Sequence, residues 1–151
     1  MFEIPARDRC PFCDYLAGAT PCAFVTRGSS ISAFMNRAQY EPGAVLVVTN
    51  EHLETVLDLD EDLFRKLHSE AQRIARGMIK AFGAVGLNMF QNNGIRAGQT
   101  IAHYHLHLVP RYPHSLSTRI FREEDYPHSP LEELTQRAAV LRAAMPQPAG
   151  A

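Results

Sequence analysis

Hydrophobic and polar residues alternate most regularly over residues 103–108, which read His-Tyr-His-Leu-His-Leu. A period of two is that of a β-strand, in which successive side chains point to opposite faces of the sheet. The pattern predicts that the three histidines share one face, while the intervening Tyr and Leu side chains enter a core. Neighbouring histidines on such a strand lie about 6–7 Å apart, a row too long for all three to bind one metal ion.

Four other segments have the patterns of strands. Cys22–Arg27 and Ile31–Asn36 flank a Gly-Ser-Ser turn, which predicts a β-hairpin. Ala44–Thr49 is continuously apolar and rich in β-branched residues, as in a central strand buried on both faces. Leu87–Gln91 predicts a further strand because the turn-forming sequence Asn-Asn-Gly follows it.

A long segment with helical periodicity separates the third and fourth of these strands. Asp58 or Asp60 is expected to cap its N-terminus, and Gly83 is expected to end it. Its apolar stripe consists of Leu63, Leu67, Ala71, Ile74, Met78 and Phe82. A second helix is predicted over residues 130–145, with Pro130 in its first turn.

These elements together predict an α+β fold, with a largely antiparallel five-stranded sheet, one long helix and a C-terminal helical extension. Residues 1–111 are expected to form the domain that carries the histidine strand. Residues 112–145 are expected to pack on this same domain, beginning with an irregular connection. Residues 146–151 are expected to be a disordered tail.

The composition narrows the class of protein. The chain has 151 residues, 46% hydrophobic and 21% charged, which suits one globular domain. Its formal net charge of -1 argues against nucleic acid or an anionic membrane as a partner. No apolar run approaches the ~20 residues of a membrane span, and residues 1–9 lack an apolar signal core. We therefore expect a cytoplasmic protein.

Three cysteines are present, and two of them form the sequence Cys10-Pro-Phe-Cys13. An odd count with one close pair argues against a disulfide scaffold. The spacing is that of half a zinc site, although a redox-active pair and a chance arrangement are alternatives. Cys22 lies in a predicted strand and is interpreted as a small buried residue.

The histidine strand, preceded by Gly98-Gln99-Thr100, resembles the signature of the histidine triad (HIT) family. The resemblance covers roughly residues 10–111. The similarity to the zinc-carrying bacterial branch of the family extends to the following positions: Cys10-x-x-Cys13, Phe34-x-Asn36, Pro42-Gly43, His52 and Asn92.

This resemblance implies a nucleotide hydrolase or transferase that acts at an α-phosphate, with His105 as the nucleophile. A neutral imidazole is a competent nucleophile near pH 7 if its other ring nitrogen is held as a donor, for instance by a backbone carbonyl. The residues expected to donate to the phosphate or the leaving group are His107, Gln99, Thr100 and Asn92. Substrates of such an enzyme would be dinucleoside polyphosphates, nucleoside phosphoramidates or adenylylated adducts.

The nucleoside is expected in an apolar pocket built partly from Ile31, Phe34 and Leu46. Asn36 matches the family position that binds the ribose hydroxyls. Arg111 is assigned to docking of the C-terminal segment or to a longer phosphate tail.

The resemblance also completes a metal site. His52 and His103 match the two ligands that join Cys10 and Cys13 in zinc-carrying members. Such a closed Cys2His2 site would hold a structural zinc ion and tie the N-terminal segment to the histidine strand.

One position departs from the family pattern. Members usually have Gly-His before the central apolar strand, where this chain has Gly43-Ala44. The missing histidine normally supports the triad by a hydrogen bond. Loss of such a partner lowers activity without removing the nucleophile.

Other functions remain open at this point. The same histidine with phosphate as the acceptor would make a phosphorylase. A catalytic metalloprotein could use His103 with His105 or His107, but no carboxylate lies between Gln91 and Arg119. A nucleotide-binding module without turnover is favoured only by Ala44. Family members are commonly homodimers that pair through the long helix and a sheet edge, so a homodimer is implied here as well.

Overall fold

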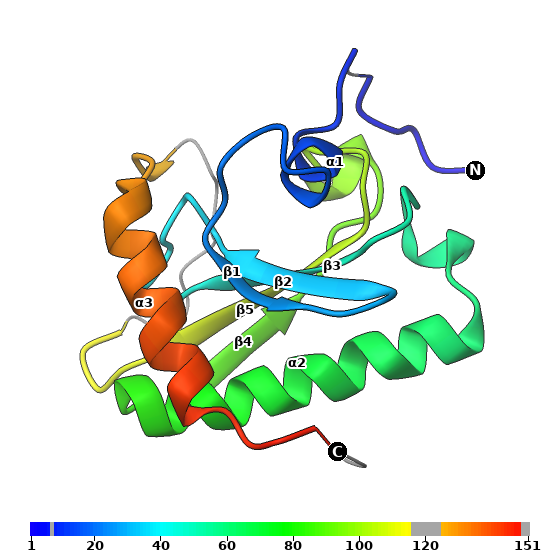
Figure 1. Cartoon of the computed structure of the whole chain (residues 1–151). Coiled ribbons are helices and arrows are strands. Elements are labelled where there is room, and N and C mark those ends of the chain that lie inside the picture. Colours follow the sequence, from blue (N-terminus) through cyan, green and yellow to red (C-terminus); the bar gives the residue numbers. More distant parts are fainter. Residues whose placement is uncertain (7, 116–124, 149–151) are drawn as a thin grey trace.

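Five antiparallel strands form one sheet in the computed structural model, which describes residues 1–6, 8–115 and 125–148. Their order across the sheet is β1-β2-β3-β5-β4, as Figure 1 shows. The strands are β1 (Phe24–Arg27), β2 (Ile31–Met35), β3 (Val45–Thr49), β4 (Gly86–Phe90) and β5 (His105–Arg111). The predicted five-stranded antiparallel sheet is confirmed, and the apolar strand β3 lies at its centre.

Helices cover both faces of this sheet (Figure 1). Helix α2 (Glu61–Phe82) and helix α3 (Leu131–Ala144) pack on one face, and the short helix α1 (Pro11–Leu16) packs on the other. Two 3-10 turns, η1 (Val56–Asp58) and η2 (Ile95–Ala97), lie in the connections. The structure thus has the predicted α+β architecture.

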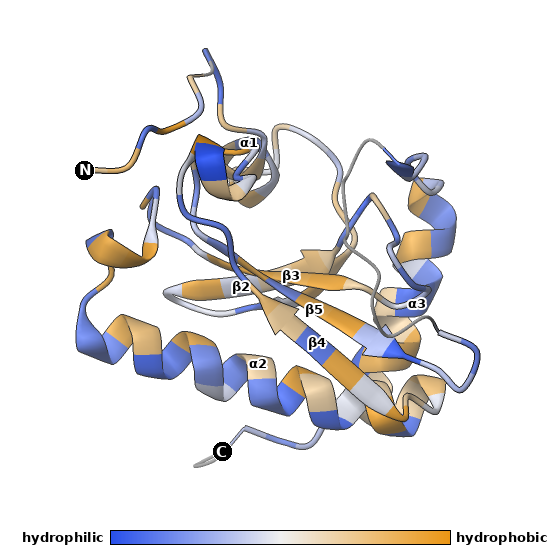
Figure 2. Cartoon of the chain, turned by 180° about the vertical axis from the view of Figure 1, so that it is seen from behind, coloured by the Kyte–Doolittle hydropathy of each residue, from blue (hydrophilic) through white to orange (hydrophobic). Residues whose placement is uncertain are grey.

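Helix α2 begins and ends where the sequence predicts. The Asp60 side chain accepts a hydrogen bond from the backbone N–H of Leu63 at 2.7 Å, and Gly83 ends the helix with a φ of 68°. Asp58, the other candidate cap, instead forms a capping box with Thr55 at η1. Figure 2 shows hydrophobic and hydrophilic residues alternating along α2, as expected of an amphipathic helix.

The alternation of side chains divides the interior into two cores. On the α2 and α3 face lie Ala33, Met35, Val47, Leu106, Leu108 and the buried stripe of α2. On the α1 face lie Phe34, Leu46 and Val48, together with Phe12 and Tyr15 of α1. His105 pairs with Val48 and His107 with Leu46, so both histidines are on the α1 face.

The histidine strand begins later than its pattern predicts. Strand β5 begins at His105, and His103 lies before it in a bend, where its backbone N–H donates to the carbonyl of Ile101 at 2.8 Å. The three imidazoles therefore do not form one row along a strand. The backbone turns at His103 because its side chain packs toward α1, while Tyr104 enters the main core.

The C-terminal segment packs on the sheet and on α2. Helix α3 buries Leu134, Ala138 and Leu141 in the main core. Ahead of it, His128 forms an isolated antiparallel bridge with Ala38. The predicted tail is described only as far as residue 148, and there the Pro146 carbonyl accepts a hydrogen bond from Arg73 at 3.0 Å. Residues 149–151, and residues 116–124 of the predicted connection, lie outside the described residues.

Among the described residues, no helix has both the length and the apolar character needed to cross a membrane.

Replacement of Leu141 by alanine tests how far the extension contributes to the core. Leu141 is fully buried, whereas its neighbour Val140 is 52% exposed. We expect Leu141→Ala to lower the free energy of unfolding by about 2–5 kcal/mol, because it leaves a cavity against α2. The control Val140→Ala should change it by less than about 0.5 kcal/mol. Urea denaturation measures both values, and equal midpoints would contradict the assigned packing.

Candidate active site and metal centre

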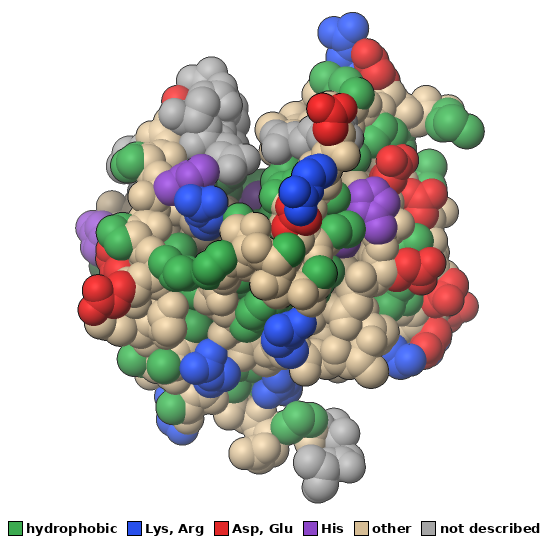
Figure 3. Space-filling model, turned by 45° about the horizontal axis from the view of Figure 1, so that its top comes forward, with side chains coloured by type: hydrophobic (Ala, Val, Ile, Leu, Met, Phe, Trp, Pro, Cys, Tyr) green, Lys and Arg blue, Asp and Glu red, His purple; other side chains and the backbone are tan. Residues whose placement is uncertain are grey.

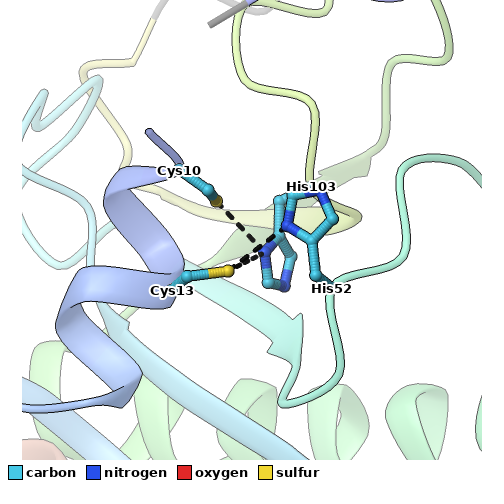
Figure 4. A group of neighbouring side chains, drawn as sticks. All are labelled: Cys10, Cys13, His52 and His103. Atoms are coloured by element: carbon cyan, nitrogen blue, oxygen red, sulfur yellow. Dashed lines mark hydrogen bonds between the residues drawn. The ribbon is translucent and has the colours of Figure 1, made fainter. Parts of the chain in front are cut away.

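Four side chains converge near the start of α1, as Figure 4 shows. Cys10 directly precedes α1 and Cys13 lies in its first turn, whereas His52 comes from the loop after β3 and His103 from the bend before β5. Their four possible ligand atoms all lie within 4.8 Å of one another. The structure therefore brings together all four residues that the sequence predicted as metal ligands.

The distances in this cluster suit a tetrahedral zinc site. The Nδ1 atom of His103 lies 3.3 Å from Sγ of Cys10 and 3.6 Å from Sγ of Cys13, and Nδ1 of His52 lies 3.3 Å from Sγ of Cys13. Zn–S bonds of about 2.3 Å and Zn–N bonds of about 2.0 Å place tetrahedral ligands roughly 3.3–3.8 Å apart. A zinc ion therefore fits these four atoms.

A hydrogen bond orients the His103 ring for this role. Its Nε2–H donates to the carbonyl of Thr49 at 2.8 Å, because a carbonyl can only accept, and Nδ1 is thereby left with its lone pair toward the cysteines. Burial lowers the pKa of His103 to about 4, so the ring is neutral. Burial also raises the pKa of Cys13 to about 11, with a further contribution from its hydrogen bond to Cys10. A bound cation would favour the thiolate instead.

The carbonyl of His103 holds the next histidine. The Nδ1 atom of His105 lies 2.6 Å from this carbonyl oxygen and must donate to it. In its neutral form the ring therefore carries its proton on Nδ1 and its lone pair on Nε2. The Phe12 ring packs edge-on against His105 at 5.2 Å between centroids and against His103 at 5.7 Å. Helix α1 therefore supports both histidines.

His107 lies beside His105 on the same face, with ring centroids 5.0 Å apart. It is 7% exposed and stacks on Phe90 at 4.4 Å and on Tyr40 at 5.8 Å. Burial, aided by the neighbouring His105, holds the pKa of His107 well below its ordinary value. Its Nδ1 atom is buried and has no hydrogen-bond partner within the described ranges.

The polar loop before β5 is organised by Gln99, which is 3% exposed. Its Nε2 donates to the carbonyls of Glu54 at 2.7 Å and Ile101 at 3.0 Å, and its Oε1 accepts from the backbone N–H of Gly94 at 2.7 Å. Because these bonds use its whole amide, Gln99 orders the loop here. The expectation that it donates directly to a phosphate is not met in this structure.

The two other loop residues differ in exposure. Thr100 is exposed, next to the buried Ile101. The Nδ2 atom of Asn92 donates to the carbonyl of Gly98 at 3.3 Å, a long bond in a partly exposed setting. Their roles toward a phosphate stay predictions.

The expected nucleoside pocket is only partly assembled from the predicted residues. Phe34 and Leu46 lie on the α1 face, whereas Ile31 belongs to the core under α2 and α3. Ile31 was therefore wrongly assigned, because it is three residues from Phe34 and an odd separation on a strand reverses the face. Asn36 is 6% exposed, and its Oδ1 accepts from the backbone N–H of Ala38 at 3.2 Å.

Arg111 lies at the end of β5 and faces Glu41, with a shortest distance of 3.6 Å. Both side chains are largely buried. Arg111 thus connects β5 to the loop between β2 and β3.

In Figure 3 many acidic side chains lie along the right-hand edge of the face shown, and histidine and basic side chains lie farther inward.

Known proteins resemble this chain in sequence and in fold. The HIT domain model matches residues 17–114, which include the His105–His107 pair and both histidine ligands. The chain belongs to the HIT family. The Protein hit of Bacillus subtilis is 36% identical over 105 residues, covering 70% of this chain and 72% of that protein.

Solved HIT structures share the fold. A Hit-like protein from Bartonella henselae superposes with a TM-score of 0.81 at 27% identity, covering 93% of this chain and 99% of the other. A zinc-bound histidine triad protein from Mycobacterium smegmatis gives a TM-score of 0.76 at 27% identity, covering 89% and 91%. The second of these carries the metal that the Cys/His cluster here would fit.

Two further relatives are named as enzymes. A bis(5'-adenosyl)-triphosphatase from Dictyostelium discoideum is 31% identical, covering 73% of this chain and 76% of that protein. An adenosine 5'-monophosphoramidase from Schizosaccharomyces pombe is 28% identical, covering 68% and 74%.

Three aromatic residues around the triad were not predicted from the sequence, namely Phe12, Tyr40 and Phe90. For Phe90 a signal was available, because strand parity and pairing place it beside His107. Phe12 lies between the two cysteines and appeared only as a spacer. Tyr40 lies in a loop, and no local pattern predicts which ring it would contact.

Metal analysis tests the Cys/His cluster. We expect about one zinc ion per chain in the purified protein and close to none in Cys13→Ala, because three ligands hold zinc far less tightly than four. The melting temperature of Cys13→Ala should fall by roughly 5–10 °C, since the metal stabilises only the folded chain.

Cys22→Ala is the matched control, because Cys22 is also a free thiol but lies outside the cluster. It should keep its zinc. Equal metal content in the two variants, measured by plasma mass spectrometry, would rule out the assigned ligands.

Proposed function

We propose that this HIT protein is a nucleotide hydrolase that cleaves at the α-phosphate through a covalent nucleotidyl-His105 intermediate. The observation that carries this proposal is the 2.6 Å hydrogen bond from Nδ1 of His105 to the His103 carbonyl. That bond keeps the ring proton on Nδ1 and leaves a lone pair on Nε2, which a nucleophile needs. The enzymatic activities of the two named relatives support the same reaction class.

In the first step, Nε2 of His105 attacks the α-phosphorus and a P–N bond forms. The bond from phosphorus to the leaving group breaks, and the leaving group departs with the electron pair and takes up a proton from solvent. In the second step, water attacks the same phosphorus and loses a proton to solvent, the P–N bond breaks with its electron pair returning to Nε2 of His105, and a nucleoside monophosphate is released. The neutral ring of His107, adjacent to His105, is assigned as a donor to the phosphate or leaving group.

Zinc held by Cys10, Cys13, His52 and His103 would act structurally in this enzyme. It would fix the backbone at His103, whose carbonyl orients the nucleophile. No step of the reaction runs through the metal.

The alternative of a catalytic metal finds less support. Within the described parts of the chain, Cys10, Cys13, His52 and His103 form the one group of three or more metal-binding side chains, and it contains neither His105 nor His107. A phosphorylase would use the same His105 intermediate with phosphate in place of water, and it is the second candidate.

Mass spectrometry after brief mixing with a dinucleoside polyphosphate tests the mechanism. We expect a transient nucleotidyl adduct on the wild type and none on His105→Ala, whose steady-state turnover should fall by at least about 10³-fold, because the nucleophile is absent. His68→Ala, which removes an exposed histidine of α2, is the control and should behave like wild type. Turnover retained by His105→Ala would refute covalent catalysis at this residue.

We also propose that the chain forms a homodimer through strand β4 and the adjoining part of α2. Strand β4 is an edge strand whose Leu87 and Met89 are exposed, and Val85 and Ile79 nearby are exposed by 69% and 63%. Met89 pairs with Leu108, so its side chain points to the α2 face, and Figure 2 shows hydrophobic residues along β4 above α2. Uncovered apolar edges favour pairing with another strand, and a second copy offers an identical edge.

Sedimentation velocity tests this interface. Met89→Lys should shift the protein from dimer to monomer at micromolar concentration, because it places a charge on the apolar edge. Leu57→Lys is a control, since Leu57 is 70% exposed but belongs to η1 and to neither β4 nor α2. A dimer that survives Met89→Lys would exclude this edge.

A further inference from the structure

Two aromatic rings stack on His107, whose Nδ1 atom has no hydrogen-bond partner among the described residues. Phe90 stacks on it nearly parallel, at 4.4 Å between centroids and an interplanar angle of 4°. Tyr40 stacks on it at 5.8 Å and 25°. Phe90 is fixed there by the pairing of β4 with β5, where it lies directly opposite His107. Tyr40 comes from the loop between β2 and β3, so strand pairing does not fix its position.

Other contacts place the Tyr40 loop. Gln39 lies at its centre: its Nε2 donates to the carbonyls of Asn36 at 2.6 Å and Ala44 at 2.9 Å, and its Oε1 accepts from the backbone N–H of Gly43 at 2.8 Å. Arg137 of α3 also donates to Oε1 of Gln39, at 3.3 Å. The loop is thus closed on itself and tied to the C-terminal helix.

The segment before α3 adds a ring behind Tyr40. Tyr126 meets the Tyr40 ring edge-on, with centroids 5.0 Å apart and an angle of 65°. Next to this contact, the backbone N–H of Ser129 donates to the carbonyl of Arg37 at 2.9 Å, and His128 forms the bridge with Ala38. The C-terminal extension therefore braces the loop that carries Tyr40.

Position 44 explains why His107 needs such support. Leu46 pairs with His107 across the strands, and residue 44 is two residues from Leu46, so its side chain lies on the same face. A histidine at position 44 would lie diagonal to His107 and within reach of its ring. The methyl side chain of Ala44 offers no donor or acceptor, and the residue is 1% exposed and packs in one cluster with Tyr40 and Val109.

The surroundings of Nδ1 have a consequence for the tautomer of His107. Its enclosed Nδ1 finds no partner among the described residues. Buried N–H groups without an acceptor are rarer in proteins than acceptors without a donor, because the unpaired donor is the costlier group. The neutral ring should therefore carry its proton on Nε2, which makes Nε2 the donor available to a substrate.

We propose that Tyr40 is a positioning residue for His107: its ring, backed by Tyr126 from the C-terminal extension, replaces by stacking the hydrogen-bonding histidine that position 44 lacks. The stack fixes the ring plane of His107 and excludes polar groups from Nδ1, so that the proton is kept on Nε2. The effect on turnover rests on the proposed hydrolase function, whereas the effect on the tautomer does not.

The test compares Tyr40→Phe with Tyr40→Leu in the full-length zinc-loaded protein. Phenylalanine keeps the ring, and leucine keeps apolar bulk without it. We expect Tyr40→Phe to retain wild-type kcat within about twofold. Tyr40→Leu should lose roughly tenfold or more in kcat with little change in KM, because it removes a residue that orients a reacting group. Tyr126→Leu should change kcat in the same direction but less.

The tautomer is read directly from the ring 15N chemical shifts of His107 by NMR. Wild type and Tyr40→Phe should show the Nε2–H form, and Tyr40→Leu should show a shift toward a mixture with Nδ1–H. The Nδ1–H form in wild type, or wild-type tautomer and kcat in Tyr40→Leu, would overturn the proposal. Absence of turnover in wild type would refute the proposed function alone, because the chemical shifts still decide the role of Tyr40.

A double variant asks whether stacking and hydrogen bonding are interchangeable. Tyr40→Ala removes the ring and opens space beside position 44, so that Ala44→His can be accommodated in the same molecule. We expect kcat of the double variant to be at least about threefold higher than kcat of Tyr40→Ala, because the new imidazole can donate a hydrogen bond to Nδ1 of His107. Equal rates in the single and double variants would overturn the idea that Tyr40 takes the place of that histidine.

Discussion

The hydrogen bond from Nδ1 of His105 to the carbonyl of His103 connects the two chemical centres of this protein. The same residue that offers this carbonyl points its ring at Cys10 and Cys13, and anchors that ring on the carbonyl of Thr49. His103 can do both because the chain bends there and enters strand β5 two residues later. Its backbone faces the nucleophile while its side chain faces the metal centre.

A metal held at this point would therefore affect catalysis without touching substrate. It would restrain His103 and, through the carbonyl, the tautomer and orientation of His105. The Phe12 ring, which packs on both imidazoles, couples helix α1 to the same unit. Loss of the metal centre should accordingly disturb more than the N-terminal segment.

The triad depends equally on the pairing of the sheet. Phe34, Leu46, His107 and Phe90 lie opposite one another in a single row across β2, β3, β5 and β4. A shift of one residue in any of these strands would send its member of the row to the opposite face, which α2 and α3 cover. This register is maintained by the apolar core on that face, which includes Leu106 and Leu108. Core packing and active-site geometry thus depend on the same pairing.

The sequence by itself determined much of this protein. Local periodicity predicted all five strands and both long helices, because each pattern is a property of neighbouring residues. The spacing of Cys10 and Cys13 indicated half of a zinc site, and the family resemblance supplied His52 and His103 as the other two residues of the metal cluster. Strand parity could also have excluded Ile31 from the nucleotide side.

Only the tertiary structure decided where the histidine strand begins and which rings enclose it. The alternating pattern extends to His103, but the strand begins only after it because the His103 side chain turns toward α1. There it contacts Cys10, some ninety positions away in the chain. From the sequence, Gln99 was predicted to donate to a phosphate, yet its side-chain amide hydrogen-bonds to the backbone of Glu54 and Gly94. Tyr40 reaches His107 because Gln39 and the C-terminal segment fold its loop. Such contacts join residues far apart in sequence, and no local pattern encodes them.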